Sequence, residues 1–309
     1  MSEIGPPILD LANLSKTYGR RGGGVRAVRG VTLSVGAGEV YGFLGPNGAG
    51  KSTTIRMLLG LISPSAGTVR LFGQDPRAYP SALRRVGSLV DGGAFYPFLS
   101  GRRNLEVLAR THGGGDERID PLLEQVGLAA DSKRKVKGYS TGMRQRLGVA
   151  AALLGDPEIV ILDEPVNGLD AAGIQEMRRL IRSLAADHGK AVFLSSHLLN
   201  EVQQVCDRVA IIHKGEVVRE STVAGLLDQD SGSLTVEAAP IEAAQAALSA
   251  RWTVERRGAV LAVAARRDEA PDVARALVGA GVALFGLTPV QRNLEEVFLA
   301  ITAEDPADA

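Results

Sequence analysis

The chain has 309 residues, and its 35 lysines and arginines are balanced by 35 aspartates and glutamates. A length of this order predicts two domains, because one domain commonly holds about 100–200 residues. The composition, 45% apolar and 23% charged, excludes a disordered chain, a collagen and a disulfide scaffold, and the zero net charge gives no reason to expect nucleic-acid binding.

The single cysteine and the short apolar runs bear on the cellular compartment of the protein and on whether it can span a membrane. Cys206 stands alone, so neither an intramolecular disulfide nor a cysteine-based zinc site is possible. The longest apolar run, at 276–287, is shorter than the roughly 18–20 residues of a membrane-spanning helix. Residues 1–7 do not have the pattern of a signal peptide. We expect a chain of the reducing cytoplasm that reaches a membrane only through a partner.

Strand and helix patterns alternate through the first 230 residues. The expected elements are strands at 8–14, 31–35 and 40–44, a helix at 51–61, strands at 67–72 and 86–90, helices at 104–111, 118–126 and 141–154, a strand at 159–162, a helix at 171–187, a strand at 191–195, a helix at 198–205 and a strand at 208–213. This alternation predicts an α/β fold with a mainly parallel sheet covered on both faces. The helical block at about 95–155 is interpreted as an insertion into that domain, which is expected to cover 1–228.

A polar, turn-forming stretch at 228–233 marks the expected domain boundary. The elements expected after it are a strand at 233–238, a helix at 241–250, strands at 252–257 and 259–265, a helix at 270–280, a strand at 282–288 and a last helix at 293–302. The β-α-β-β-α-β order predicts a small α+β domain of the ferredoxin-like type over 231–309. This part carries a net charge of −4, so the first 230 residues carry +4.

A phosphate-binding loop is indicated directly after the strand at 40–44. The residues that fit G-x-x-x-x-G-K-[ST] are Gly45, Pro46, Asn47, Gly48, Ala49, Gly50, Lys51 and Ser52. The glycines let consecutive N–H groups point at phosphate oxygens, and the following helix adds the positive end of its dipole. Lys51 is expected to reach the β- and γ-phosphates of a nucleotide, with Thr53 among the nucleotide contacts, and Ser52 to offer its hydroxyl to Mg²⁺.

Two carboxylates stand at the end of the apolar run at 159–162. Ligands of open α/β sheets bind at the C-terminal ends of the strands, so Asp163 and Glu164 are expected beside the phosphate loop. Asp163 would hold Mg²⁺, through water, and Glu164 would polarise an attacking water. Glu164 and Lys51 are predicted catalytic residues, and Asp163 a predicted metal ligand.

Further motifs resemble those of the ATP-binding-cassette (ABC) ATPases in order and spacing, over roughly residues 8–228. Lys16-Thr17-Tyr18-Gly19 resembles the aromatic A-loop, Tyr139-Ser140-Thr141-Gly142-Met143 the signature usually written LSGGQ, Asn167-Gly168-Leu169-Asp170 the D-loop, and Ser195-Ser196-His197 the switch histidine. The resemblance identifies the fold as a phosphate-loop nucleotidase cassette with a helical insertion, and it implies ATP and Mg²⁺ as ligands.

The resemblance also implies how the cassette works. Two cassettes bind head to tail, either two copies of this chain or this chain with a second ABC subunit, and each ATP lies between the phosphate loop of one and the signature of the other. Tyr18 would stack on adenine, and His197 would be a third catalytic residue that contacts the γ-phosphate and Glu164. Ser140 and Gly142 would face the γ-phosphate across the dimer, and Asp170 is counted among the nucleotide-binding residues.

The sequence departs from the family pattern at two places. The signature has Thr141 and Met143 where glycine and glutamine are usual. Asp91 stands where the family has a Q-loop glutamine, and its carboxylate would reach Mg²⁺ or its water; it is otherwise a turn former before two glycines. We expect a working ATPase with altered coupling.

These departures resemble the bacitracin- and daunorubicin-type export ATPases. By that resemblance a separate polypeptide forms the transmembrane permease, and the chain lies on the cytoplasmic face of the membrane. The permease would rest in a groove near residues 91–104, where Phe95, Tyr96 and Phe98 suit an interface, although they would equally suit a core. The alternatives are an importer ATPase, an ABC ATPase that acts on DNA or ribosomes, and a phosphate-loop kinase. Neutral charge and the 112 residues between Lys51 and Asp163, too few for a long coiled coil, disfavour the nucleic-acid roles.

Overall fold

The computed structural model describes residues 6–19, 23–90, 92–111, 116–229 and 233–290, together with Leu294, Glu296 and Phe298. The chain divides into two compact units, Met1–Thr222 and Val223–Ala309. The division precedes the predicted boundary at 228–231, because a short helix, α7 (Val223–Gln229), belongs to the second unit. No helix within the described ranges is long and apolar enough to cross a bilayer.

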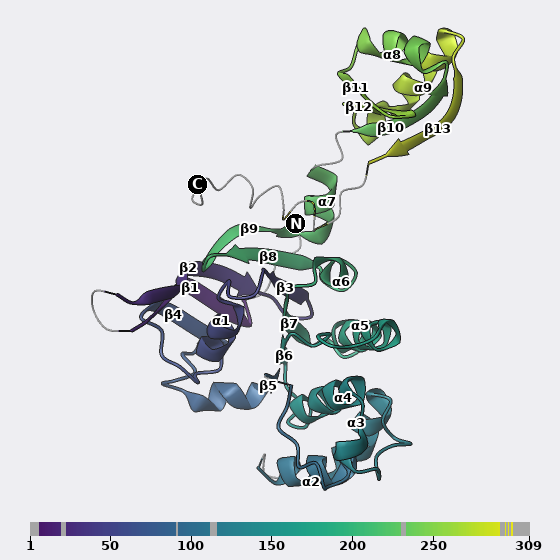
Figure 1. The fold of residues 1–309 in the computed structure, drawn as a ribbon. Coiled ribbons are helices and arrows are strands. Elements are labelled where there is room, and N and C mark those ends of the chain that lie inside the picture. The colour runs from purple at the N-terminus through teal and green to yellow at the C-terminus, as the bar shows by residue number, and fades with distance from the viewer. Residues whose placement is uncertain are drawn as a thin grey trace. The chain divides into compact units, whose positions relative to one another are not determined.

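A six-stranded sheet forms the centre of the first unit (Figure 1). Its strands are β3 (Val40–Leu44), β5 (Val86–Leu89), β6 (Ile159–Asp163), β7 (Ala191–Ser196), β8 (Arg208–His213) and β9 (Glu216–Thr222), in the order β5-β6-β7-β3-β8-β9. All pairs are parallel except β8 with β9. Every residue of β3, β6 and β7 is buried, as expected of parallel strands covered on both faces.

A second, antiparallel sheet packs in the same unit, and the sequence did not predict it as a separate layer. Its strands are β1 (Leu9–Tyr18), β2 (Val25–Val35) and β4 (Ala66–Leu71), in the order β2-β1-β4. The first two strands are longer than predicted, because their mainly polar ends pair with each other, Tyr18 with Val25 and Lys16 with Val28. Backbone pairing between neighbouring strands, rather than apolar alternation, extends this hairpin.

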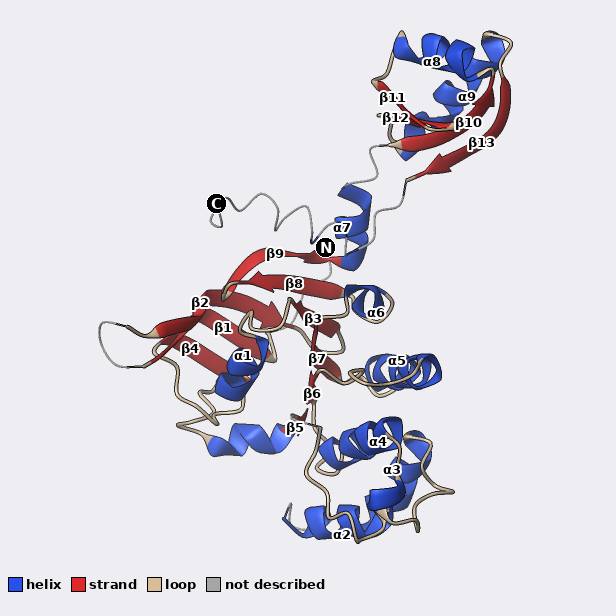
Figure 2. Cartoon of the chain, viewed as in Figure 1, coloured by secondary structure: helices blue, strands red, loops and turns tan. Residues whose placement is uncertain are grey.

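Helices cover the central sheet on both sides (Figure 2). The helices of the first unit are α1 (Lys51–Leu58), α2 (Gly101–Thr111), α3 (Ile119–Gln125), α4 (Thr141–Ala152), α5 (Ala171–Ala186) and α6 (Leu199–Gln203), with short 3₁₀ turns at Pro80–Arg85, Asp116–Arg118 and Val136–Gly138. Helices α2 to α4 lie between β5 and β6 in the chain, over the range of the predicted helical insertion. Helix α1 ends at Leu58, earlier than the predicted residue 61, because Gly60 takes a left-handed conformation and its N–H donates to Met57 O.

The second unit contains a four-stranded antiparallel sheet with two helices. Its elements are β10 (Leu234–Ala239), α8 (Ile241–Ser249), β11 (Val254–Arg257), β12 (Val260–Val263), a 3₁₀ turn (Arg267–Glu269), α9 (Ala270–Gly279) and β13 (Ala283–Pro289). The strand order β11-β12-β10-β13 is the ferredoxin-like arrangement. The helix expected at 293–302 falls largely outside the described residues; Leu294, Glu296 and Phe298, the three that are described, are helical.

Candidate functional site

Three loops meet at one edge of the central sheet. Strands β3, β6 and β7 are parallel neighbours, and Leu44 pairs with Ser196 while Asp163 pairs with Ser195. The aromatic rings of Tyr41 in β3 and Phe193 in β7 stack on each other, with 5.9 Å between the ring centres. The segments that begin at residues 45, 164 and 197 therefore leave the sheet side by side, as expected for a ligand site of an open α/β sheet.

The phosphate loop needs its glycines for close packing and for an unusual backbone. A Cβ atom on Gly45 would lie 2.2 Å from the carbonyl oxygen of Ile212, a distance that no side chain tolerates. Gly50 precedes α1 with φ of 109°, and Gly48 has φ of 83°, both in the left-handed region that glycine adopts at low cost. The N–H groups that open α1 have no acceptor within the helix, so the loop can hold an anion.

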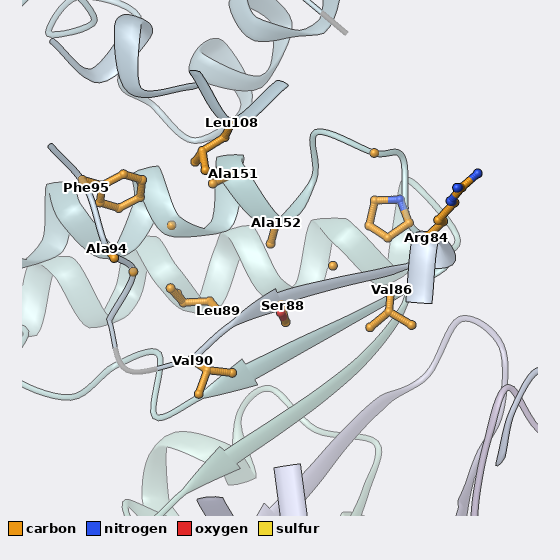
Figure 3. Close-up of a pocket in the computed structure, with 15 residues that line it drawn as sticks. Arg84, Val86, Ser88, Leu89, Val90, Ala94, Phe95, Leu108, Ala151 and Ala152 are labelled. Atoms are coloured by element: carbon orange, nitrogen blue, oxygen red, sulfur yellow. The ribbon is translucent and has the colours of Figure 1, made fainter. Parts of the chain in front are cut away.

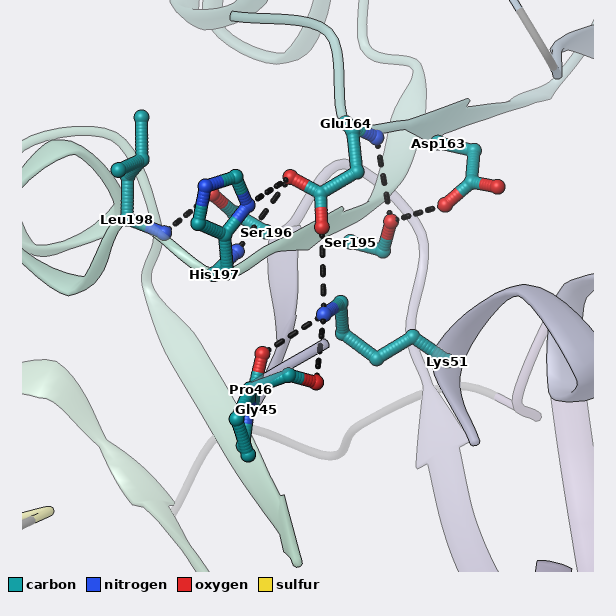
Figure 4. Close-up of polar contacts among 9 residues, drawn as sticks. All are labelled: Gly45, Pro46, Lys51, Asp163, Glu164, Ser195, Ser196, His197 and Leu198. Atoms are coloured by element: carbon teal, nitrogen blue, oxygen red, sulfur yellow. Dashed lines mark hydrogen bonds and ion pairs between the residues drawn. The ribbon is translucent and has the colours of Figure 1, made fainter. Parts of the chain in front are cut away.

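Lys51 lies at the centre of the site (Figure 4). Its Nζ donates to Gly45 O at 2.7 Å and to Pro46 O at 3.2 Å, and it forms an ion pair with Glu164 Oε1 at 3.2 Å. The side chain is only 6% exposed. An ammonium group that is shielded from water in this way attracts anions more strongly than one on the surface.

Glu164 connects the lysine to the histidine. Its second oxygen, Oε2, lies 2.8 Å from Nδ1 of His197 and accepts from the His197 backbone N–H at 3.4 Å. The backbone of Glu164 has φ of 50°, which costs free energy in a residue with a side chain. This strained conformation aims the carboxylate between Lys51 and His197 (Figure 4).

Asp163 is held by Ser195, a residue to which the sequence interpretation gave no role of its own. Ser195 Oγ donates to Asp163 Oδ1 and accepts from the Glu164 N–H at 3.1 Å. Asp163 and Ser195 are both buried. The signal for this contact is the strand register, since Asp163 and Ser195 are directly paired across β6 and β7, and register is not visible in a single sequence.

The signature segment opens α4 away from this carboxylate cluster. Ser140 precedes the helix, and its Oγ accepts from the Met143 N–H at 3.2 Å. Arg144 donates to Tyr139 O at 2.8 Å and to Thr141 Oγ1 at 3.3 Å. The threonine that departs from the family pattern thus takes part in fixing the start of the helix.

The D-loop packs against the signature within the same chain. Asp170 precedes α5 and accepts from the Gly173 N–H at 2.8 Å. Leu169 lies over Gly142, where an added Cβ would meet its Cδ2 at 3.6 Å, and an added Cβ on Gly168 would meet Thr141 Cγ2 at 3.7 Å. Of the predicted site residues, Lys51, Asp163, Glu164 and His197 form one group, and Ser140, Gly142 and Asp170 belong to another.

Tyr18 lies at the end of β1 and is 42% exposed. The Nζ of Lys16 lies 5.2 Å from the centre of the Tyr18 ring and donates to Ser63 O at 2.6 Å. The exposed aromatic surface can therefore stack on a flat ligand. Asp91, predicted as a metal and coupling residue, lies outside the described residues.

A cavity of about 340 Å³ lies between β5 and α4 (Figure 3). Phe95 and Leu108 line it from the helical insertion, and glycines form part of its wall. A Cβ on Gly87 would lie 2.2 Å from Ala152 O, which explains the close approach of β5 to α4. Tyr96 and Phe98, predicted for a groove here, do not line the cavity and are exposed.

Known proteins resemble the chain in sequence and fold. The ABC transporter family profile matches residues 28–167. The bacitracin transport ATP-binding protein BcrA of Bacillus licheniformis is 47% identical over 69% of each chain. The daunorubicin/doxorubicin resistance ATP-binding protein DrrA of Streptomyces peucetius is 38% identical over 97% of this chain and 93% of its own. The ATP-binding cassette MJ0796, solved as a dimer in a post-hydrolysis state with ADP and Pi, matches with a TM-score of 0.63 and 25% identity over 70% of this chain and 98% of its own.

Proposed function

The chain belongs to the ABC transporter ATP-binding proteins and is an ATPase of that family, and we propose that it drives export of drug-like compounds through a separate membrane permease. ATP hydrolysis in this proposal rests on the network of Lys51, Glu164 and His197 at the mouth of the phosphate loop, and export rests on the similarity to BcrA and DrrA. The network combines a shielded cation for phosphate with a carboxylate and an imidazole for a water molecule.

ATP binding must rearrange the contacts of Lys51. In the structure its ammonium group contacts the two loop carbonyls and Glu164. The β- and γ-phosphates would replace these partners, which releases Glu164 toward the water that attacks the γ-phosphorus. Mg²⁺, when bound, would neutralise charge on the phosphates, and Ser52 and Asp163 are its expected ligands because hard cations take oxygen donors and keep several waters.

Glu164 would accept the proton of the attacking water. Its contact with His197 holds the carboxylate in position, and the imidazole would bond to the γ-phosphate at the same time. General base catalysis of this kind contributes about 10²–10⁴-fold to a rate. Glu164, His197 and Lys51 are thus the proposed catalytic residues.

The signature and the D-loop would act on the ATP of a second cassette. The start of α4 presents Ser140 and the amides near Gly142, which form an anion site. In a head-to-tail dimer, formed by two copies or with another ABC subunit, this site would meet the γ-phosphate held by the partner, with Asp170 beside it. Tyr18 would stack on adenine, and Thr53 would complete the phosphate contacts.

The cavity between β5 and α4 is the proposed contact with the permease. It is mainly apolar, as the centre of a protein interface is, and Phe95 from the predicted 91–104 segment lines it. Asp91 is the first residue of this segment and would take the place of the Q-loop glutamine between permease and Mg²⁺. The second unit, 223–309, is proposed as an accessory domain. These contacts would keep the protein at the cytoplasmic face of the membrane.

Reconstitution tests this proposal. The chain would be purified with and without a candidate permease that co-purifies with it, and ATP hydrolysis measured in lipid nanodiscs. We expect the permease to stimulate hydrolysis, Asp91→Ala to reduce that stimulation more than ATP binding, and Lys51→Ala to abolish both. Stimulation by ribosomes or DNA instead of the permease would favour the non-membrane alternative, and uptake rather than release of substrate would favour an importer.

A further inference from the structure

Exposed aromatic and basic side chains share one surface of the helical insertion. We call it the basic–aromatic surface, formed by Tyr96, Phe98, Lys133, Lys135 and Lys137. The rings of Tyr96 and Phe98 contact each other at 5.8 Å between centres and are 51% and 63% exposed. All three lysines are exposed. None of the five residues lines the cavity next to α4.

Backbone pairing holds the two halves of this surface together. Lys135 pairs with Ser100 in an antiparallel bridge. The Lys137 N–H donates to Pro97 O at 2.8 Å, and the Val136 N–H donates to Leu99 O at 2.9 Å. Val136 is buried between the two exposed lysines. These contacts hold Lys135 and the 3₁₀ turn Val136–Gly138 against residues 97–100, and Lys135 and Lys137 remain exposed on either side of Val136.

The positive charge of this surface is not balanced locally. In the described part of the chain, Lys133, Lys135 and Lys137 form no salt bridge, and Arg134 pairs with Asp131, which is the only acidic residue of residues 131–138. The whole chain has no net charge, so three unpaired cations within five residues form a local excess. Basic residues combined with exposed aromatic rings are typical of protein surfaces that lie at the membrane–water interface.

We propose that the basic–aromatic surface binds the anionic headgroups of phospholipids, with Tyr96 and Phe98 entering the interfacial layer. The inference rests on the proposed function only in that a permease would bring this chain to a membrane. Lysine presents a mobile, point-like charge on a flexible stem, which suits headgroups that diffuse in the plane. It does not supply the planar fork of arginine that fixes a carboxylate of a protein partner.

Vesicle flotation of the full-length protein tests the inference. Vesicles of phosphatidylcholine alone are compared with vesicles that also contain one-third phosphatidylglycerol, at low and high salt. We expect binding only to the anionic vesicles, weakened by salt. Each lysine near an anionic surface contributes about fivefold, so the combined Lys133→Gln, Lys135→Gln and Lys137→Gln variant should bind about a hundredfold more weakly. Tyr96→Ala with Phe98→Ala should also weaken binding.

Two matched variants complete the experiment. Replacement of the same three lysines by arginine should preserve vesicle binding, and replacement of three exposed arginines elsewhere, Arg110, Arg179 and Arg267, by glutamine should leave it unchanged. Unaltered binding by the glutamine variant of the lysines, or equal wild-type binding to both kinds of vesicle, would overturn the inference. It would also be overturned if the glutamine variant of the lysines lost permease association but not vesicle binding, since the surface would then bind an acidic protein segment.

The proposed function and this inference can fail separately. Failure of ATP hydrolysis in the wild type would contradict the proposed function and leave vesicle binding as a separate result.

Discussion

At the residue scale, the site depends on side chains that hold the carboxylates rather than on the carboxylates alone. Ser195 is fully buried and bonds to Asp163 and to the Glu164 N–H. Glu164 adopts a left-handed backbone, and His197 and Lys51 hold its two oxygens. A single substitution among these residues is therefore expected to affect ATP hydrolysis and ATP binding to different extents.

Ser195→Ala should impair hydrolysis more than ATP binding. The change removes the donor to Asp163 in a buried site, which costs about 1–3 kcal/mol, and it lets the proposed metal ligand move. Chemical denaturation measures the loss of stability, and steady-state hydrolysis at increasing Mg²⁺ measures the effect on the proposed metal ligand. Ser196→Ala is the matched control, because Ser196 is also buried, and among the described residues its hydroxyl accepts only from the Leu198 N–H in its own turn. Equal losses in the two variants would refute a positioning role for Ser195.

At the element scale, close contact between β5 and α4 joins the sheet to the helical insertion. A side chain on Gly87 would lie 2.2 Å from Ala152 O, and one on Gly148 would lie 2.5 Å from Leu89. These glycines let the strand and the helix approach beside the cavity.

Gly87→Ala should destabilise the first unit by about 1–3 kcal/mol, because overpacking forces the backbone of α4 to move. Thermal melting followed by circular dichroism measures the change. Gly279→Ala, in α9, has open space around the added methyl group and should be neutral or slightly stabilising. If Gly87→Ala melted like the wild type, the contact would not be tight in solution.

A charged contact also ties the insertion to the sheet. Asp156 accepts from Arg118 at 3.0 Å and from Lys190 at 2.9 Å. These hydrogen bonds, with Arg118 the stronger influence, hold the pKa of Asp156 well below its usual value. A depressed pKa stabilises the folded state at any pH above the unfolded pKa, and this stabilisation is lost as pH falls toward the folded pKa.

Asp156→Asn should therefore lower stability by a constant amount between pH 8 and pH 5, with the cost shrinking only below about pH 4. We expect about 0.5–1 kcal/mol, because the carboxylate is largely exposed and screened. Asparagine tolerates the left-handed backbone found at residue 156, so the change isolates the charge. Urea denaturation across this pH range measures the cost, and a cost that rises from pH 8 to pH 5 would contradict the assignment.

The sequence indicated most elements of the fold but not their pairing. Apolar runs such as those of β3 and β6 were found because burial on both faces leaves an unbroken signal. The strand β9 was missed, since its residues are mostly polar and exposed at the sheet edge. The carboxylates were predicted from their place after a strand, whereas the contact of Ser195 with Asp163 depends on register between β6 and β7, which one sequence does not specify.

At the scale of the whole molecule, two units have separate cores. Buried residues of the second unit pack around Trp252, Leu248 and Leu277, among other apolar side chains. Its strand order needs no strand from the first unit. The phosphate loop, both carboxylates and His197 lie within the first unit.

A chain that ends at residue 229 should fold and bind ATP like the full-length protein. The truncation keeps α7, whose Val223 and Leu226 are buried, and removes the ferredoxin-like elements. Isothermal titration calorimetry compares ATP affinity, and circular dichroism checks folding of this piece and of residues 233–290. A folded but nucleotide-free truncation would show that the second unit contributes to the site.

The central claim is that Glu164 activates the water that hydrolyses ATP between two cassettes. Its most direct test is steady-state ATP hydrolysis by Glu164→Gln, measured together with its oligomeric state in sedimentation velocity. The substitution preserves side-chain size but removes the base, so hydrolysis should fall about 10²–10⁴-fold while Mg²⁺-ATP holds the chain as a dimer. Hydrolysis close to the wild-type rate would contradict the account, whereas a variant that stays monomeric with ATP bound would leave only the pairing with a second ABC subunit.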